Sequence, residues 1–197
     1  MEPDQTTTPF AGLLPEVVLS AIESLGFVTD GRLLALNSYE NRVWQVGLEQ
    51  GEPLIAKFYR PGRWSDEAIL EEHRFALELV EHELPIVPPM VLADDTLHHY
   101  QGHRFSLFKR FGGHAPELAD QETLKTLGRL MGRIHAIGAT SDFAHRPTIH
   151  PETMGRDSVR FLLNHQWIPM HLESAFESIT QDLLAAIDDN WQHASEK

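Results

Sequence analysis

A single lysine inside an apolar run, followed fifteen residues later by a glutamate, is the pattern in this sequence best suited to binding an anion. Lys57 lies in the β-prone run 54–59, where burying an ammonium group is costly. Because a strand alternates faces, Ile55, Lys57 and Tyr59 should share one side. Two interpretations are evenly matched on this stretch alone. The lysine stem can lie along apolar surface with its charge at the edge, or a carboxylate can hold the lysine for binding an anion.

The carboxylate comes from the helix that the next residues predict. Ser65 is a good N-cap, and acidic residues follow it in the first turn of a helix that should run to about residue 83. Its expected buried face is marked by Ile69, Ala76, Leu77 and Val80. This face places Glu72 on or beside the core and turns Glu71 toward Glu78. Glu72 therefore either pairs with Lys57, the nearest cation in sequence, or flanks the apolar stripe and is solvated.

The elements that must position these two residues can be read along the chain. Apolar spacing predicts a first helix over 14–25, and short alternating runs predict an antiparallel meander that includes the lysine strand. The predicted strands are 32–37, 42–48, 54–59, 90–93 and 103–108, with His98 and His99 in a turn. Asp120 is the expected N-cap of a helix to about 137 with Leu124, Leu127, Met131 and Ile134 on its core face, and helices over 156–165 and 171–193 follow.

Composition and charge exclude several classes of function. The chain has 197 residues, a net charge of −13 and no cysteine, so no basic face, disulfide or thiolate site is expected. Non-specific binding to nucleic acid or to an anionic membrane is therefore disfavoured. The longest apolar run is broken by prolines, and the amino terminus does not resemble a signal peptide. A cytoplasmic monomer is expected, with an acidic surface or a basic neighbour for residues 161–196, which contain neither Lys nor Arg.

The order of these elements matches the small lobe of a protein-kinase-like fold. In that fold the lysine of the third strand contacts ATP phosphates and a helix glutamate orients it. Ile55, on the side of Lys57, would line the adenine site. The usual glycine-rich phosphate loop is missing, and the polar stretch 37–41 stands in its place. That stretch can offer backbone N–H groups and the Ser38 hydroxyl to phosphate, or it can be a plain hairpin turn.

Several segments resemble the bacterial stress response kinase A family, which are Ser/Thr protein kinases of the aminoglycoside-phosphotransferase and choline-kinase variant of the kinase fold. The segments are LNSYENRVWQV, AKFYRPGRWSDEAILEEHRFALELV, LGRLMGRIHAIG and HRPTIHP. The resemblance implies that Ser38 contacts ATP, that Lys57 binds phosphate and that Glu72 is its partner. It also implies that the backbone near 108–111, which includes Lys109 and Phe111, binds the adenine edge.

The resemblance also implies which parts should lie elsewhere. Kinases of this variant carry an H-G-D-x-x-x-x-N catalytic loop and a metal-binding Asp motif, and neither occurs between Gly113 and Lys197. Both are expected beyond Lys197, together with the ligands for Mg²⁺. We therefore predict an α+β fold with an arm and helix over 1–30, a small lobe over 31–111 and part of a helical large lobe over 112–197.

The predicted function is ATP binding for a Ser/Thr protein kinase involved in stress response. The longer parent would transfer the γ-phosphoryl group to hydroxyls of protein substrates, and this chain by itself should be inactive, because base and metal ligands are needed together. Two alternatives stay open. One is a kinase of the same fold that acts on an amino-alcohol or sugar, and the other is a non-catalytic nucleotide-binding or interaction module.

Overall fold

The computed structural model describes residues 9–113, 115–116 and 119–195, with the side chains of 193–195 excepted. The first eight residues of the predicted arm therefore lie outside the described residues. The chain divides into two compact units, 1–146 and 147–197. The helix predicted for 120–137 belongs to the first of these units, and the predicted three-part division at residues 30 and 111 stays a prediction.

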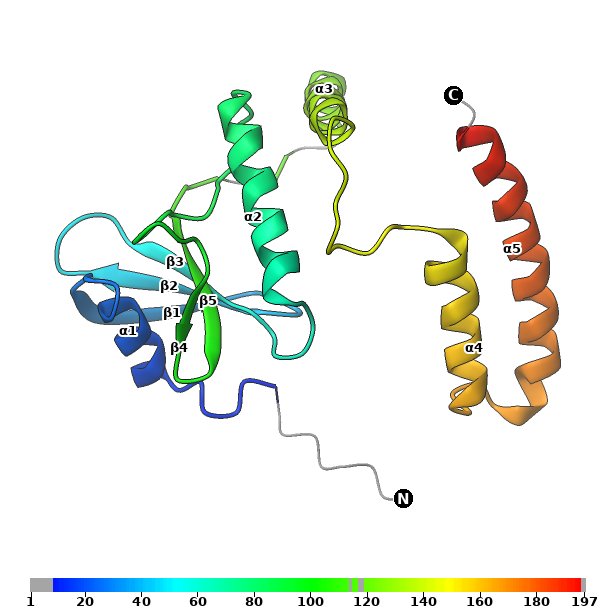
Figure 1. The fold of residues 1–197 in the computed structure, drawn as a ribbon, viewed down its shortest axis with the longest axis horizontal. Helices are drawn as coiled ribbons and strands as arrows, with labels where there is room; N and C mark the ends of the chain where they lie inside the picture. The colour runs from blue at the N-terminus through cyan, green and yellow to red at the C-terminus, as the bar shows by residue number, and fades with distance from the viewer. Residues whose placement is uncertain (1–8, 114, 117–118, 196–197) are drawn as a thin grey trace. The chain divides into compact units, whose positions relative to one another are not determined.

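The first unit is built on a five-stranded antiparallel sheet, as predicted (Figure 1). Its strands are β1 (Thr29–Leu36), β2 (Arg42–Leu48), β3 (Leu54–Phe58), β4 (His98–Tyr100) and β5 (His103–Lys109). They are ordered β1-β2-β3-β5-β4, so β3 lies at the centre and carries Lys57. The fold is α+β, and the strand that carries the lysine is flanked on both edges by antiparallel partners.

The predicted strand over 90–93 is wrong, and β4 lies where a turn was expected. The 90–93 region contributes only isolated bridges, because Pro88 and Pro89 cannot donate to a ladder and Ala93 turns away with a positive φ of 50°. Gln101 and Gly102 both have positive φ, which is the geometry of the tight turn that joins hairpin strands. The hairpin thus forms on either side of these two residues rather than around Asp94.

One face of the sheet is closed by α1 (Pro15–Glu23). Val18, Ala21 and Ile22 of α1 are fully buried. They belong to one cluster with the inward-facing strand residues Val46, Leu54, Ala56, Phe58, Phe105 and Leu107. The strand alternation predicted around Lys57 is therefore present, because Leu54, Ala56 and Phe58 are buried on the side away from the lysine.

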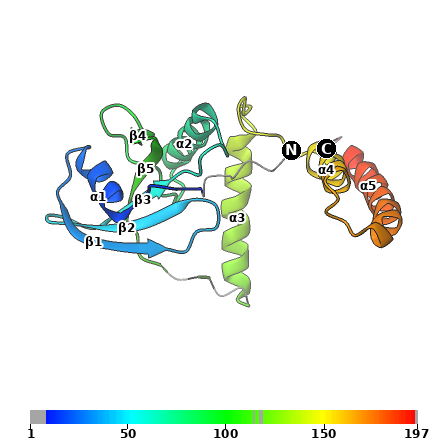
Figure 2. The same cartoon turned by 90° about the horizontal axis from the view of Figure 1, so that it is seen from below.

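The second helix, α2 (Asp66–Glu81), lies on the other side of the sheet from α1 (Figures 1 and 2). Its predicted N-cap is confirmed, since Ser65 Oγ accepts a hydrogen bond from the Ala68 N–H at 3.2 Å. Ile69 is buried as predicted, but Val80 is exposed. The buried side of α2 instead includes Glu71 and His73, because both polar side chains form hydrogen bonds with residues outside the helix.

The helix after the sheet, α3 (Gln121–Gly138), begins at the predicted N-cap. Asp120 accepts hydrogen bonds from the backbone N–H groups of Glu122 and Thr123 at 3.3 and 2.9 Å. Its predicted core face is not buried: no residue of α3 is, and Leu124 and Met131 are exposed. The sequence pattern identified an amphipathic helix correctly, but its apolar side is covered only in part: Leu127 and Ile134 are half-buried, and Phe75 of α2 lies close to Gly138.

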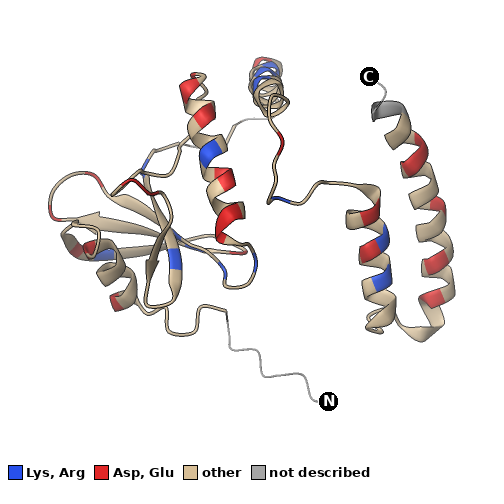
Figure 3. Cartoon of the chain, viewed as in Figure 1, with Lys and Arg blue, Asp and Glu red and all other residues tan. Residues whose placement is uncertain are grey.

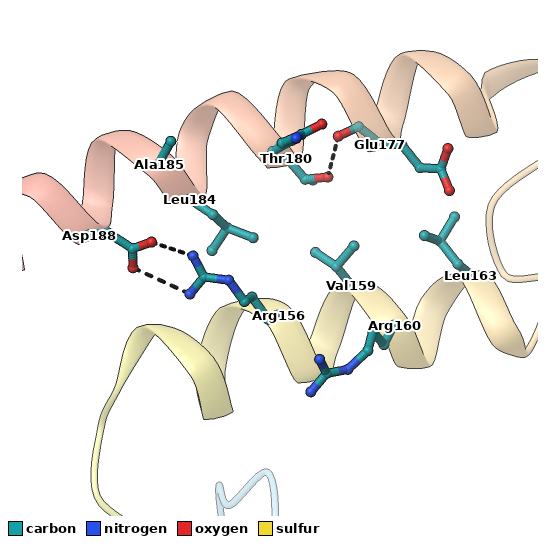
Figure 4. Close-up of a pocket in the computed structure, with 10 residues that line it drawn as sticks. Arg156, Val159, Arg160, Leu163, Glu177, Thr180, Leu184, Ala185 and Asp188 are labelled. Atoms are coloured by element: carbon teal, nitrogen blue, oxygen red, sulfur yellow. Dashed lines mark hydrogen bonds and ion pairs between the residues drawn. The ribbon is translucent and has the colours of Figure 1, made fainter.

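The second unit is a helical hairpin. It consists of a π-helical turn η1 (Pro151–Arg156), α4 (Asp157–Asn164), a short 3₁₀ turn η2 (Met170–Leu172) and α5 (Glu173–Ser195). The charged residues coloured on the α5 ribbon are all acidic, whereas η1 and α4 carry both acidic and basic residues (Figure 3). Arg156 pairs with Asp188 of α5 across the groove between the helices (Figure 4). The basic neighbour expected for the acidic segment is therefore present at this position.

None of the helices within the described ranges is both long and apolar enough to cross a membrane.

Candidate functional site

The lysine and glutamate singled out from the sequence contact each other. Lys57 Nζ lies 3.4 Å from Glu72 Oε1, and its side chain is 24% exposed. The Lys57 ammonium also lies 4.8 Å from the ring centroid of Tyr59, within cation–π range. Burial lowers the pKa of Lys57, and the nearby charge of Arg146 lowers it further. A partly desolvated ammonium held by one carboxylate can offer its remaining protons to an anion.

The face of the sheet around Lys57, which we call the open face, carries apolar residues that remain accessible. Cross-strand pairing places Leu34 beside Gln45, Gln45 beside Ile55, and Ile55 beside Phe108. Leu34 is 57% exposed even though it lies in the sheet. A flat apolar surface next to a cation suits a ligand with an aromatic part and an anionic part.

The stretch 37–41, which replaces a glycine-rich loop, is fixed to the turn that follows β3. Glu40 accepts hydrogen bonds from Arg63 Nε and Trp64 Nε1, both at 3.0 Å. Asn41 Oδ1 accepts one from the Arg60 N–H at 3.2 Å. The bond from Arg63 is the main cause that holds the pKa of Glu40 below its ordinary value. Ser38 is half-buried in this stretch.

The register places this stretch at the Lys57 end of the sheet. Leu36 pairs with Val43, and Val43 pairs with Lys57, so the 37–41 connection begins beside the lysine. Lys109 pairs with Leu54 at the other end of β3, about 10 Å away at the usual rise per residue. The predicted phosphate-binding and adenine-binding residues therefore lie at opposite ends of the same short strand.

In the predicted adenine-binding stretch, the side chains of neighbouring residues lie on different sides of the sheet. Lys109 pairs with Leu54, and therefore its side chain lies on the face that α1 closes, not on the open face. Phe111 lies beyond the strand and is 68% exposed. Arg110 reaches back over the sheet, where its Nε donates to Gln45 Oε1 at 3.0 Å. Of this stretch, the backbone, Phe108 and Arg110 lie at the open face, and a contact of Phe111 with the adenine stays a prediction.

Sequence reasoning missed a second set of contacts around the glutamates. Glu71 is only 8% exposed, and its carboxylate accepts hydrogen bonds from three consecutive backbone N–H groups, those of Ala144, His145 and Arg146, at 2.6, 2.9 and 2.8 Å. Burial by itself raises the pKa of Glu71, but these bonds together outweigh it and hold the pKa below the ordinary value. The prediction that Glu71 lies on the less buried side of α2 is therefore wrong.

Arg146 joins this set to the lysine pair. Its guanidinium forms an ion pair with Glu72, its Nε donates to the Ala68 carbonyl at 3.1 Å, and it stacks over the Trp64 ring at 4.4 Å. Glu72 thus lies between two cations, Lys57 and Arg146. The only sequence signal was the resemblance of the HRPTIHP segment, to which no role was attached.

A buried polar chain lies behind the lysine. The Tyr59 hydroxyl is 2.7 Å from His73 Nε2, and His73 Nδ1 is 2.9 Å from Thr96 Oγ1. Burial, with a smaller effect of the Lys57 charge, lowers the pKa of His73 to about 4, so the ring is neutral near pH 7. Burial also raises the pKa of Tyr59 to about 12. The chain fixes the aromatic ring that supports the Lys57 ammonium.

The described part of the chain contains no group of three or more His, Asp or Glu side chains that could hold a metal ion. Glu72, the carboxylate nearest to Lys57, is already shared by two cations. No residue here is therefore assigned to Mg²⁺.

Comparison with protein families gives one match that spans most of the chain. Residues 32–197 match the phosphotransferase enzyme family, abbreviated APH. The matched range includes the whole of β2, β3, β5 and α2, and with them Lys57, Glu72 and Arg146.

Similar curated proteins carry kinase names. The chain is 37% identical over 183 residues to stress response kinase A of Shigella flexneri and of Escherichia coli K12, and 36% identical to the serine/threonine protein kinase RdoA of Salmonella typhimurium. Each alignment covers 93% of this chain but 56% of the relative. The chain therefore spans about half the length of these relatives.

Among solved structures, the amicoumacin kinase hAmiN in complex with AMP-PNP, Ca²⁺ and Ami is similar with a TM-score of 0.63. The two chains are 17% identical, and the match covers 85% of this chain and 53% of that one. At this identity the likeness shows the fold, which is that of an APH-type kinase.

Proposed function

Because the chain belongs to the phosphotransferase enzyme family, we propose that its open face binds ATP and that Lys57 contacts the phosphates. The adenine would lie toward Ile55 and the backbone near 108–111, and the phosphates toward Lys57 and the Ser38 stretch. Glu72 would orient the lysine, which is the arrangement that kinases use to position phosphate oxygens.

The Lys57–Glu72 ion pair at the edge of an accessible apolar sheet face is the observation that carries this proposal. A lysine that only avoids burial would extend its ammonium into solvent. Lys57 is instead held over Tyr59 and against Glu72 with three quarters of its side chain covered. The cation is thus kept at one end of a surface that an aromatic base can cover.

The activity of the longer protein is proposed from its relatives. We infer that the parent of this chain is a Ser/Thr protein kinase of the stress response, active as a cytoplasmic monomer, which transfers the γ-phosphoryl group of ATP to protein hydroxyls. The names of the relatives support this inference. A divalent cation such as Mg²⁺ would neutralise phosphate charge there. This chain, by itself, should bind nucleotide without transferring phosphate, since it lacks the catalytic-loop sequence.

Calorimetry with Mg-ATP on the 197-residue chain tests the binding site. We expect Lys57→Met to weaken ATP binding at least about tenfold, the size of one lost hydrogen bond to a charged group. Lys125→Met is the matched control, because Lys125 is an exposed lysine of α3 that pairs only with Glu122 among the contacts of the described residues. Equal affinity of Lys57→Met and the parent, with both folded by circular dichroism, would refute the assignment.

A second experiment addresses the acceptor and the alternatives. The coding sequence beyond Lys197 should contain H-G-D-x-x-x-x-N, and an immediate stop codon would instead favour a non-catalytic nucleotide-binding module. A protein of the length of the relatives should phosphorylate Ser or Thr peptides in a panel that also contains amino-alcohols and sugars. Transfer only to the small molecules would replace the protein-kinase proposal with a small-molecule kinase of the same fold.

A further inference from the structure

We propose that Arg146 is a positioning residue of the nucleotide site, which holds Glu72 in place for Lys57 from a segment that Glu71 fastens to α2. We call residues 144–146 the latch. This inference rests on the proposed function, because it assigns the latch to the same site. The latch lies outside the sheet and α2, and it is more than seventy residues away from both glutamates in sequence.

The latch is fastened through its backbone. The Glu71 carboxylate accepts hydrogen bonds from the three consecutive backbone N–H groups of residues 144–146. The side chains in the latch can therefore change without loss of these bonds. A carboxylate that receives several backbone N–H groups is satisfied without a cation. Glu71 therefore does not compete with Glu72 for Lys57, even though the two glutamates are adjacent in α2. The adjacent pair divides two tasks: Glu71 binds the latch and Glu72 binds the lysine.

Arg146 then fixes a carboxylate that is otherwise only partly restrained. Glu72 is 43% exposed, and its contact with Lys57 is long, at 3.4 Å. Such a side chain would lose little by rotating into water. Arg146 restrains it from a rigid position, because the arginine is fixed by the Ala68 carbonyl and by the Trp64 ring as well as by its own backbone bond to Glu71. One oxygen of the Glu72 carboxylate is thus kept beside Lys57 while the other pairs with Arg146.

The two cations of this cluster are compatible with an anionic ligand. Lys57 and Arg146 share the carboxylate of Glu72, and the neighbouring carboxylate of Glu71 is bonded to the backbone N–H groups of residues 144–146. A carboxylate in place of Arg146 would add negative charge beside Lys57 and repel phosphate. Arg146 therefore orders Glu72 without reducing the attraction of the site for a phosphate group.

A double-mutant cycle on Mg-ATP affinity separates positioning from a direct contact. The variants are Arg146→Met, Glu72→Gln and the two combined, and calorimetry is done on the full 197-residue chain. We expect Arg146→Met to weaken binding about tenfold, the size of one charge-assisted hydrogen bond, and to have no further effect in the Glu72→Gln background. Arg146→Lys should recover part of the loss, because lysine supplies the charge but only one of the donor directions.

Arg133→Met is the matched control for a general effect on α2. Arg133 also reaches this helix, where it donates to the His82 carbonyl at 2.7 Å, but at the end far from Glu72. It should leave the ATP affinity unchanged. If Arg146→Met weakens binding equally with and without Glu72, Arg146 touches the nucleotide directly and the positioning role is wrong. If Lys57→Met weakens binding and Arg146→Met does not, the latch is wrong while the proposed function stands.

A measurement without nucleotide keeps the inference testable if the chain does not bind ATP, an outcome that would refute the proposed function. Trace labelling with acetic anhydride over a range of pH, read by mass spectrometry, gives the protonation midpoint of each lysine. Glu72→Gln should lower the midpoint of Lys57 in the parent, because the ammonium loses its carboxylate, and should have little effect in the Arg146→Met background, with Lys109 and Lys125 as internal references. The same shift of the Lys57 midpoint on Glu72→Gln in both backgrounds, below their thermal transitions, would overturn the latch.

Discussion

Replacing His73 with glutamine should remove much of the acid sensitivity of the first unit. His73 is 2% exposed and lies between the Tyr59 hydroxyl and Thr96. Burial first, then the charge of Lys57, lowers its pKa to about 4 against an ordinary value of 6.5; Asp95 opposes this shift and His98 adds to it. Between these two pH values the unfolded chain binds a proton that the folded chain does not, so acid favours unfolding.

The size of the effect follows from these two pKa values. The contribution of His73 is fully present above pH 6.5 and is lost progressively as the pH falls toward 4. Linkage gives a loss of about 2 kcal/mol in unfolding free energy between pH 7 and pH 5. A glutamine at this position does not titrate, but its amide can still accept from Tyr59 and donate to Thr96. The variant should therefore be less stable at pH 7 yet much less sensitive to pH.

Hydrogen exchange by mass spectrometry, corrected for intrinsic rates, measures the pH dependence of the local unfolding free energy. Peptides from β3 and α2 report the opening of the first unit without interference from the helical hairpin. The control is His82→Gln, because His82 is an exposed residue at the end of the same helix. The reasoning is refuted if the parent and His73→Gln show the same change in protection between pH 7 and pH 5. If His82→Gln also loses the pH dependence, the acid sensitivity does not come from His73.

Two further predictions concern single contacts. Ser65→Ala should lower the stability of the first unit by about 1 kcal/mol, because the Ala68 N–H loses its cap, and the same exchange experiment measures it; Ser65→Asp should retain the cap, and an unchanged stability in Ser65→Ala would contradict the prediction. Glu40→Gln should weaken ATP binding a few-fold in calorimetry, because one of its two donors, Arg63 or Trp64, loses its acceptor and the 37–41 stretch loosens. The exposed Glu52→Gln is its control, and equal affinities for the two variants would show that Glu40 does not support the site.

Prediction from the sequence succeeded where short-range chemistry decides the structure. Ser65 and Asp120 start their helices as predicted because a cap acts within three residues. The alternation of Leu54, Ala56 and Phe58 against Lys57 is a property of any strand. It failed for the strand expected at 90–93, where neighbouring prolines and a residue with positive φ outweighed the apolar character.

The division of roles between Glu71 and Glu72 shows the limit of a periodic pattern. Helical spacing treats a glutamate as polar and assigns it to the solvent side or to the nearest cation. Glu71 is buried because backbone N–H groups from residues 144–146 satisfy it, and His73 is buried because Tyr59 and Thr96 do. Their partners lie between 14 and 75 residues away, beyond what any local pattern encodes.

The sequence by itself determined the order of β1, β2, β3, β5 and the helices and the caps at Ser65 and Asp120, since these depend on alternation and capping, and it offered the pairing of Lys57 with Glu72 as one of two interpretations. Only the tertiary structure decided which face of the sheet stays open, that the side chain of Lys109 lies on the closed face, and that Arg146 shares Glu72. The physical reason is that burial and electrostatic partners are set by segments that meet only when the chain folds.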